Sequence, residues 1–432
     1  MTICYKNWPD LVRDRVTFYN VAGMNRPKLD VTQLRRRDPL AWTMLLNSHP
    51  DMREVVVTAV SACPLKDEAL RSQEQQLIRY VLTLANHSDP ITFIGKRTNQ
   101  TEALFYRDFA SELSELTPRC LFTRVNPDDG WVILDDVPSD YAPQQWTAVD
   151  IETITRSLAE LHFTFWEREE ELDNLPHFIG RQQKTYTWDE LRQQETIYFE
   201  EGPASVISEH AIKSAGRLAP VLLRAANGLA VIRSLGGWPG ILGESHLSAA
   251  ADLLDDPLPM LQTLHDLPAT LLHGDPHNYR WHLTLFDNHR LLDWHKLVVG
   301  PGIYDLVKFA EQLDLIYMMH GHTQVYARQQ MPVSQETIID SYILTLKSKL
   351  GPHFEARTAR QAIPAARCLY VLTHWFPYFA DWFSQMPNKY TWQKINRMSD
   401  EQLMGTLFQP IVGFRPYLAS VFQRFLQSYR TL

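Results

Sequence analysis

Two hydrophobic patterns divide the chain. Up to about residue 137, short runs rich in apolar and β-branched residues alternate with polar turn sequences, which indicates β-strands. From about residue 138 onward, apolar residues recur mostly at three- and four-residue spacing, which indicates helices. The pattern therefore predicts an α+β protein with two lobes, a small antiparallel β-sheet lobe followed by a large, mainly helical lobe.

The first lobe is expected to contain its elements in the order strand, strand, strand, helix, strand, strand. The third strand ends at Lys96, and the helix after it carries an apolar stripe between Ala103 and Leu116. A turn sequence with Pro, Asp and Gly joins the last two strands. The expected strands are 54–60, 76–84, 91–96, 120–125 and 131–134, and the expected helix is 101–116.

A short helix is predicted before the first strand. Asp38 can cap it and Pro39 suits its first turn. Its apolar face is expected to consist of Leu40, Trp42, Leu45 and Leu46. We therefore expect residues 1–50 to be an N-terminal extension packed on the small lobe.

The second lobe is expected to begin with an amphipathic helix over residues 150–166. Its helical pattern is interrupted at 282–294 by a strand–turn–strand sequence, whose second strand would end at Asp293. The predicted divisions are 1–50, a nucleotide-binding β-rich lobe over 51–137, and a helical lobe over 138–432 with the catalytic loop and the acceptor site. The lobes would meet near residues 135–140.

Composition narrows the class of protein. The 432 residues are 45% hydrophobic, so a large packed core is expected, and the net charge of −8 does not suit a nucleic-acid binder. No apolar stretch approaches the length of a membrane span, and the first ten residues lack the apolar run of a signal peptide. The four cysteines form no Cys-x-x-Cys, which favours reduced thiols and a cytoplasmic location. No oligomeric state follows from these features.

The residues that could carry chemistry lie between 271 and 306. A His-Gly-Asp sequence contains Asp275, a Leu-Asp-Trp sequence contains Asp293, and a Gly-Pro-x-x-x-Asp-Leu sequence contains Asp305. Two carboxylates at adjacent loop ends can face one site. Such a pair suits phosphoryl transfer, because one carboxylate can orient a hydroxyl and accept its proton while the other holds Mg²⁺ on nucleotide phosphates.

In this order and spacing, the motifs resemble those of the aminoglycoside phosphotransferase and choline kinase-like group, which has the protein-kinase-like fold. The upstream half is similar too: Lys96 looks like the family's strand lysine, and Glu102 like the helix glutamate that pairs with it. Trp131–Val137 looks like the hinge strand, whose backbone would bond adenine. The resemblance covers about residues 50–310.

The resemblance implies a set of roles and cofactors. Asp275 would be the catalytic base, Asp293 a metal ligand, and Asp305 a support for the catalytic-loop backbone, with His273 packing that loop. The cofactors would be ATP, or GTP, and Mg²⁺. The residues implied to contact the nucleotide are Lys96, Glu102, Asp135, Val137 and Ser61.

Two features depart from the family pattern. The family usually has Asn five residues after the catalytic Asp, as a second Mg²⁺ ligand, and this chain has Arg280 there. Arginine has no acceptor atom, so Asn278 is the residue expected to take over metal binding. The phosphate-covering segment 61–76 contains no glycine, and Ser61 and Ser72 are the small polar residues that it offers instead.

The leading hypothesis is an ATP-dependent phosphotransferase acting on a hydroxyl of a small molecule such as a sugar, an amino alcohol, a related metabolite or an antibiotic. The alternative, favoured by Arg280, is a catalytically degenerate kinase-like protein that binds nucleotide or a partner without turnover. A third hypothesis is a metal-dependent hydrolase that uses the histidines at 273–295. The aromatic run Thr373–Phe383 is either core between packed helices or a wall of the acceptor pocket.

Overall fold

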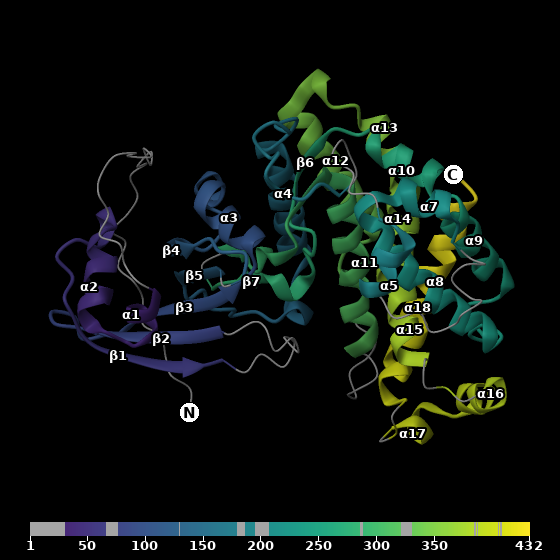
Figure 1. The fold of residues 1–432 in the computed structure, drawn as a ribbon, viewed down its shortest axis with the longest axis horizontal. Helices are drawn as coiled ribbons and strands as arrows, with labels where there is room; N and C mark the ends of the chain where they lie inside the picture. The colour runs from purple at the N-terminus through teal and green to yellow at the C-terminus, as the bar shows by residue number, and fades with distance from the viewer. Residues whose placement is uncertain are drawn as a thin grey trace.

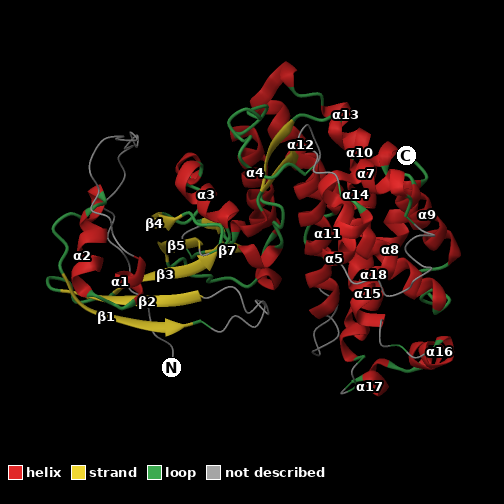
Figure 2. Ribbon diagram, viewed as in Figure 1, coloured by secondary structure: helices red, strands yellow, loops and turns green. Residues whose placement is uncertain are grey.

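The computed structural model consists of a β-rich lobe and a helical lobe (Figures 1 and 2). In Figure 2 the long strands lie together on one side of the molecule and most helices on the other. This confirms the predicted α+β class and the order of the lobes. The structure describes residues 31–65, 77–128, 130–178, 186–194, 207–285, 288–320, 331–383, 386, 388–404, 406 and 408–432.

The small lobe is built on a five-stranded antiparallel sheet with the order β1-β2-β3-β5-β4. Lys96 on β3 lies in register with Val132 on the neighbouring strand β5. Helix α3 (Gln100–Asp108) follows β3 after a single linking residue, Asn99. The strands are β1 (Val57–Pro64), β2 (Leu77–Leu84), β3 (Ile91–Thr98), β4 (Cys120–Arg124) and β5 (Gly130–Asp135).

The order of these elements is confirmed, the third strand runs on to Thr98 instead of ending at Lys96, and the first strand and the helix differ more from their predicted bounds. The first strand begins at Val57 and runs through Pro64, because residues 57–64 pair continuously with β2 apart from one irregularity near Ala59. The helix after β3 ends at Asp108 and is followed by a 3₁₀ turn, Ala110–Leu113. Apolar periodicity does not distinguish the two helix types over so short a stretch.

Helices α1 (Val31–Arg35) and α2 (Pro39–Asn47) pack on one face of the sheet. The Asp38 carboxylate accepts a hydrogen bond from the Leu40 amide at 3.0 Å, so the predicted cap is confirmed. Trp42 is fully buried and its ring lies 4.8 Å from that of Tyr80 on β2. Leu40, expected on the apolar face, is 66% exposed instead. The predicted division of the chain at 50/51 and 137/138 stays a prediction.

The helical lobe has one continuous hydrophobic core. Helix α11 (Gly302–His320) packs against α12 (Gln335–Leu350), α14 (Ile363–Tyr370) and α18 (Gln409–Tyr429). The first helix of the lobe, α4, spans Ala148–Thr164 and packs against α12. The other helices are α5 (Trp188–Gln194), α7 (Glu209–Ala215), α8 (Ala219–Ser234), α9 (Glu244–Asp255), α10 (Leu258–His265), α13 (Ala356–Gln361), α15 (Phe376–Phe383), α16 (Lys389–Arg397) and α17 (Asp400–Leu403).

Two small sheets hold the loops of the motif region. Strand β6 (Ala269–Leu272) pairs with β9 (Val298–Pro301), and β7 (Trp281–Leu283) pairs with β8 (His289–Leu291), both antiparallel. The predicted hairpin is therefore present. It is shorter than expected, so Asp293 lies two residues beyond the second strand rather than at its end.

The aromatic run forms a five-residue π-helix, Val371–Trp375, followed by α15. Trp375, Phe376, Phe379 and Phe383 are buried, as expected for core between helices. His374 is only partly buried and Tyr378 is 44% exposed, so one side of the run reaches the surface.

One helical stretch of the described chain, His210–Ser234, is long and apolar enough to cross a membrane by length and composition. The most apolar window in it is 72% buried inside the structure, as in a helix of a protein core.

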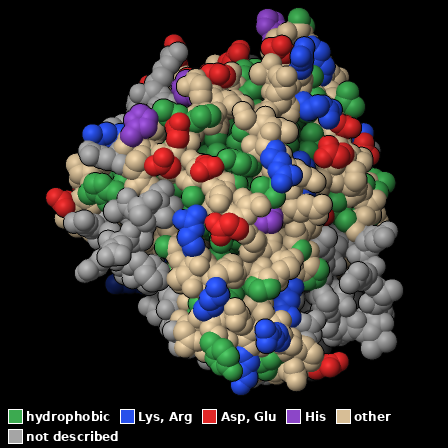
Figure 3. All heavy atoms as spheres, turned by 90° about the vertical axis from the view of Figure 1, so that its right-hand side faces the viewer, with side chains coloured by type: hydrophobic (Ala, Val, Ile, Leu, Met, Phe, Trp, Pro, Cys, Tyr) green, Lys and Arg blue, Asp and Glu red, His purple; other side chains and the backbone are tan. Residues whose placement is uncertain are grey.

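On the outer face of the helical lobe, acidic, basic and hydrophobic side chains are interspersed (Figure 3).

Candidate functional site

Lys96 and Glu102 form a buried ion pair at the end of strand β3. The Lys96 Nζ lies 2.7 Å from Glu102 Oε2, as predicted. The Asn99 side chain caps α3 by accepting from the Glu102 amide at 2.9 Å, which places the glutamate in the first helical turn. Burial alone would lower the pKa of Lys96, but Glu102 and Asp293 outweigh it and raise that pKa. The lysine is therefore held as a cation, directed at Asp293.

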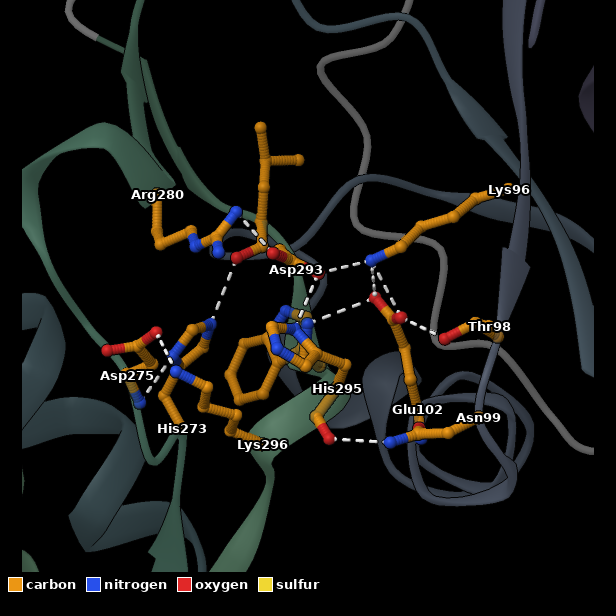
Figure 4. Close-up of polar contacts among 12 residues, drawn as sticks. Lys96, Thr98, Asn99, Glu102, His273, Asp275, Arg280, Asp293, His295 and Lys296 are labelled. Atoms are coloured by element: carbon orange, nitrogen blue, oxygen red, sulfur yellow. Dashed lines mark hydrogen bonds and ion pairs between the residues drawn. The ribbon is translucent and has the colours of Figure 1, made fainter. Parts of the chain in front are cut away.

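Asp293 joins the two lobes. Its carboxylate contacts Lys96 of the small lobe, Arg280 of the motif region, and His295, whose Nδ1 lies 2.8 Å from Oδ1 (Figure 4). Its backbone has a φ of 69° in the left-handed region, which Asp adopts more readily than most residues. Burial opposes ionisation, but the charge of Lys96, with His295 and Arg280, holds the pKa of Asp293 far below its usual range.

The His-Gly-Asp loop is held by a carboxylate that does not reach the site. Asp305, at the start of α11, accepts from the His273 amide at 2.7 Å and from the Gly274 amide at 3.1 Å. His273 is buried and its Nε2 lies 2.9 Å from the Leu292 carbonyl oxygen. The expected supporting places of Asp305 and His273 are confirmed.

Asp275 lies between two lysines. The Lys296 Nζ is 2.7 Å from Asp275 Oδ2, and the Lys308 Nζ is 3.1 Å from Oδ1 and 2.7 Å from the Gly274 carbonyl oxygen. Burial would raise the pKa of Asp275, but the charges of Lys308 and Lys296 outweigh it and hold that pKa well below its usual range. The carboxylate is therefore ionised and can accept a hydrogen bond from a hydroxyl.

Gly274 allows the loop to turn against Lys296. Its φ is +78°, and a Cβ built on it would lie 2.0 Å from the Lys296 carbonyl oxygen. We expect Gly274→Ala to lower the free energy of unfolding by about 3 kcal/mol or more, because the clash adds to backbone strain.

Gly240→Ala is the matched control. Gly240 has a φ of +82° and nothing within 4 Å of a built Cβ, so it should lose only the strain of about 1–2 kcal/mol. Chemical denaturation of both variants measures the difference. Equal losses would show that the approach of Lys296 to Gly274 does not constrain the loop.

The implied nucleotide contacts lie in three places. Ser61 is exposed within strand β1, so the expectation of a loop at this position is wrong, and Ser72 lies outside the described residues. The Asp135 carboxylate contacts Arg119 at 3.1 Å. The Val137 carbonyl oxygen lies 2.9 Å from His282 Nδ1, so one side of this acceptor is already engaged. The roles of these residues stay proposals.

Arg280, not Asn278, contacts Asp293. The Arg280 guanidinium forms an ion pair with Asp293 Oδ2, whereas Asn278 Oδ1 accepts a hydrogen bond from the Tyr279 amide at 3.0 Å. Asn278 is buried, and its Nδ2 has no hydrogen-bond partner. Among the described residues, these contacts do not identify Asn278 as a metal ligand. Its assignment stays a prediction.

The donor set fits one Mg²⁺ and not two. The ionised Asp293 carboxylate is the type of ligand that Mg²⁺ takes together with nucleotide phosphates. Arg280 stands at the sequence position of the family's second ligand and carries only donors. In the part of the chain that the structure describes, no group of three or more His, Cys, Asp or Glu side chains is placed to hold a metal by itself.

The histidines of the motif region have separate partners. His273 and His282 contact the carbonyl oxygens of Leu292 and Val137, and His289 contacts the Ser157 hydroxyl. The other two, His277 and His295, lie beside Asp275 and Asp293 respectively. Among the described residues these contacts do not gather three ligands for the metal of the hydrolase hypothesis.

Sequence reasoning missed the two lysines at Asp275 and the histidine at Asp293. Lys296 and His295 follow the Leu-Asp-Trp sequence directly, and Lys308 lies one helical turn after Asp305 on α11. Their proximity to the motif carboxylates was the available signal. It was weak, because side-chain directions in a 3₁₀ turn such as Trp294–Lys296 depend on packing.

The fold and the site together define a class. A small antiparallel sheet carries a lysine paired with a glutamate of the next helix, and a helical lobe supplies two aspartates beside it. This is a protein-kinase-like fold.

No family model matches the sequence, and no curated protein matches it. Among solved structures, the chain is similar to choline kinase from Cryptosporidium parvum, at 12% identity and a TM-score of 0.43, covering 88% of this chain and 92% of that one. It is similar to an aminoglycoside phosphotransferase from Alicyclobacillus acidocaldarius, at 12% identity and a TM-score of 0.41, covering 85% and 91%. It is also similar to a putative fructosamine-3-kinase from Haemophilus somnus, at 9% identity and a TM-score of 0.36, covering 82% of this chain and 96% of that one.

By their names, these proteins belong to the group that the sequence motifs resemble. The expected resemblance is thus confirmed as a structural similarity. With TM-scores below 0.5 the similarity goes no further, and the fold class rests on the described elements themselves.

Proposed function

We propose that this protein is a phosphotransferase that uses ATP, or GTP, to phosphorylate a hydroxyl of a small molecule. The observation that carries the proposal is the meeting of Lys96 with Asp293, 197 positions later in the chain, beside a second ionised aspartate, Asp275. A buried lysine cation and two carboxylates are the groups that phosphoryl transfer needs for positioning and charge stabilisation.

The nucleotide lies between the lobes in this proposal. Lys96 and Arg280 turn from Asp293 to phosphate oxygens, and Glu102 keeps the lysine in place. The adenine bonds the Val137 N–H near Asp135, and Ser61 lies on the phosphate side. Asp293, with Asn278 as the expected second ligand, holds Mg²⁺, which when bound neutralises phosphate charge.

Asp275 acts on the acceptor. Its carboxylate accepts a hydrogen bond from the acceptor hydroxyl, aims the oxygen at the γ-phosphate and takes the proton as the new bond forms. Asp305 and Lys308 hold the loop so that this carboxylate stays in position. The acceptor is a small molecule, with no nucleic acid or membrane as partner, and the proposed location is the cytoplasm.

The Arg280–Asp293 ion pair favours one second candidate, a protein that binds nucleotide without turnover. Both carboxylate oxygens of Asp293 are already engaged, Oδ1 by Lys96 and the His295 ring and Oδ2 by Arg280. A protein that keeps these pairs would bind nucleotide with little help from a divalent ion.

Binding of ATP with and without Mg²⁺ tests the proposal. We expect isothermal titration calorimetry of the full chain to show tighter binding of Mg·ATP than of ATP in EDTA, by about tenfold or more. Equal affinities would favour the protein without turnover. An absence of nucleotide binding under both conditions would contradict both candidates.

Arg280→Asn is expected to weaken ATP binding about tenfold without raising turnover, because the guanidinium bonds phosphate in the proposed complex. Arg290→Gln, on the neighbouring strand β8, is the matched control, since Arg290 bonds the Glu115 carbonyl oxygen at 2.6 Å. Calorimetry and an ADP-release assay measure both quantities. A large gain in turnover would instead show that Arg280 disables the site.

A further inference from the structure

The two halves of the site differ in charge. Around Asp293, the cations Lys96 and Arg280 are balanced by the carboxylates of Asp293 and Glu102. Around Asp275, two lysines face one carboxylate. The side chains in direct contact with Asp275 therefore carry an excess positive charge, while the nearby Asp305 carboxylate is engaged by the His273 and Gly274 amides.

The lysines at Asp275 are placed differently. The Lys308 side chain is 11% exposed and also donates to the Gly274 carbonyl oxygen, so it holds the loop from helix α11. The Lys296 side chain is 51% exposed, and Figure 4 shows its end beside the Asp275 carboxylate. Lys296 is thus free to contact a ligand that approaches Asp275.

The positive charge in contact with Asp275 comes from the two lysines. Burial, together with the charge of Lys308, lowers the pKa of the nearby His374 to about 3, so its imidazole adds no positive charge near pH 7.

The π-helix faces the same region. Its Thr373 hydroxyl lies 2.9 Å from the Tyr304 hydroxyl, one turn before Lys308 on α11. His374 stacks on Tyr370 with ring centroids 5.0 Å apart. One turn after Lys308, the buried Gln312 has an Oε1 atom without a hydrogen-bond partner. π-Helical turns are frequent at functional sites, and an unpaired buried acceptor is suited to a hydroxyl donor.

We propose that the acceptor is an anion, a hydroxyl compound that also carries a carboxylate or another oxyanion. The inference rests on the proposed function and specifies its substrate class. Lys296 binds the oxyanion. Asp275 takes the proton of the acceptor hydroxyl while the hydroxyl oxygen forms the new bond to the γ-phosphorus. The bond from that phosphorus to the bridging oxygen breaks, and ADP leaves with the electron pair. An acceptor with an ammonium group would face two lysine cations across one carboxylate.

Sets of acceptors that share a carbon frame and carry an anionic, a neutral or a cationic substituent test the proposal. The probes are glucuronate, glucose and glucosamine, and 4-(hydroxymethyl)benzoate, benzyl alcohol and 4-(aminomethyl)benzyl alcohol. Their binding to the full chain saturated with Mg·AMP-PNP is measured by thermal shift, and turnover with Mg·ATP by ADP release. We expect the anion of at least one set to bind and react at least about tenfold better than its cation, with a preference that weakens as salt is added.

Lys296→Gln should reduce that preference about tenfold with AMP-PNP affinity unchanged. Lys394→Gln, on α16 at the far end of the helical lobe (Figure 1), is the matched control and should keep it. A preference for the cations would overturn the proposal of an anionic acceptor. The proposal would also be overturned if neither set showed a preference for the anion, and a set in which nothing binds counts as showing none. Failure of AMP-PNP to bind the wild-type chain overturns the proposed function instead, so the two failures are distinguishable.

Discussion

Asp275→Asn is expected to lower kcat by about 10³-fold while leaving the affinity for Mg·ATP within about twofold of wild type. The amide is nearly isosteric with the carboxylate, so the loop held by Asp305 should keep its shape. It carries no charge and cannot accept the proton of the acceptor hydroxyl. The loss therefore falls on the transition state and not on nucleotide binding.

An ADP-release assay with the best acceptor measures kcat, and calorimetry measures affinity. The exposed Asp173→Asn serves as the control for loss of a carboxylate. The substitution also leaves the largely buried Lys308 with less compensation, so thermal unfolding should show whether the variant is still folded at the assay temperature. Full phosphotransfer by a folded Asp275→Asn variant would contradict the proposed role of Asp275.

Asp293→Ala is expected to abolish the enhancement of ATP binding by Mg²⁺ and to lower the free energy of unfolding by about 3–5 kcal/mol. The stability loss follows because Lys96 and Arg280 would remain largely buried without the carboxylate that pairs with both. Since the alanine would also be strained at a φ of 69°, the variant could fail to fold.

Asp293→Asn keeps the test decisive. Asn tolerates the left-handed backbone and can still accept hydrogen bonds, so the site loses mainly its negative charge. ATP in EDTA should bind this variant at least as tightly as wild type, because Lys96 and Arg280 are free to meet phosphate. Calorimetry with and without Mg²⁺ checks both expectations. Retention of the wild-type Mg²⁺ enhancement by a folded variant would show that the ion is held elsewhere.

The local structure of the site could be predicted from the sequence because its determinants are adjacent in the chain. A strand that ends beside Lys96, the cap Asn99 and the helical pattern after it place Glu102 one turn into α3, within reach of the lysine. The loop with Asp275 and the helix start with Asp305 are joined by a short paired segment, β6 with β9. Strand alternation and caps act over a few residues, so the pattern of residues contains them.

The neighbours of the two motif aspartates could not be predicted in the same way. The sequence identified Arg280 as a departure, and the expectation that Asn278 would take over metal binding is still untested. The structure shows that Arg280 itself meets Asp293. Both groups leave a 3₁₀ turn, Asn278–Arg280, where neighbouring side chains point in different directions and packing decides which one faces the site.

The order of the elements, the paired lysine and glutamate, and the two carboxylates at loop ends can be predicted from the sequence, since each depends on spacing along the chain. The convergence of Lys296 and Lys308 on Asp275 and the balance of the cations around Asp293 arise from the packing of distant elements. These are contacts between side chains from separate elements, and Lys96 meets Asp293 across 197 positions. The charge of a site is a sum over such contacts, so it is set when the elements pack together and not by any local pattern.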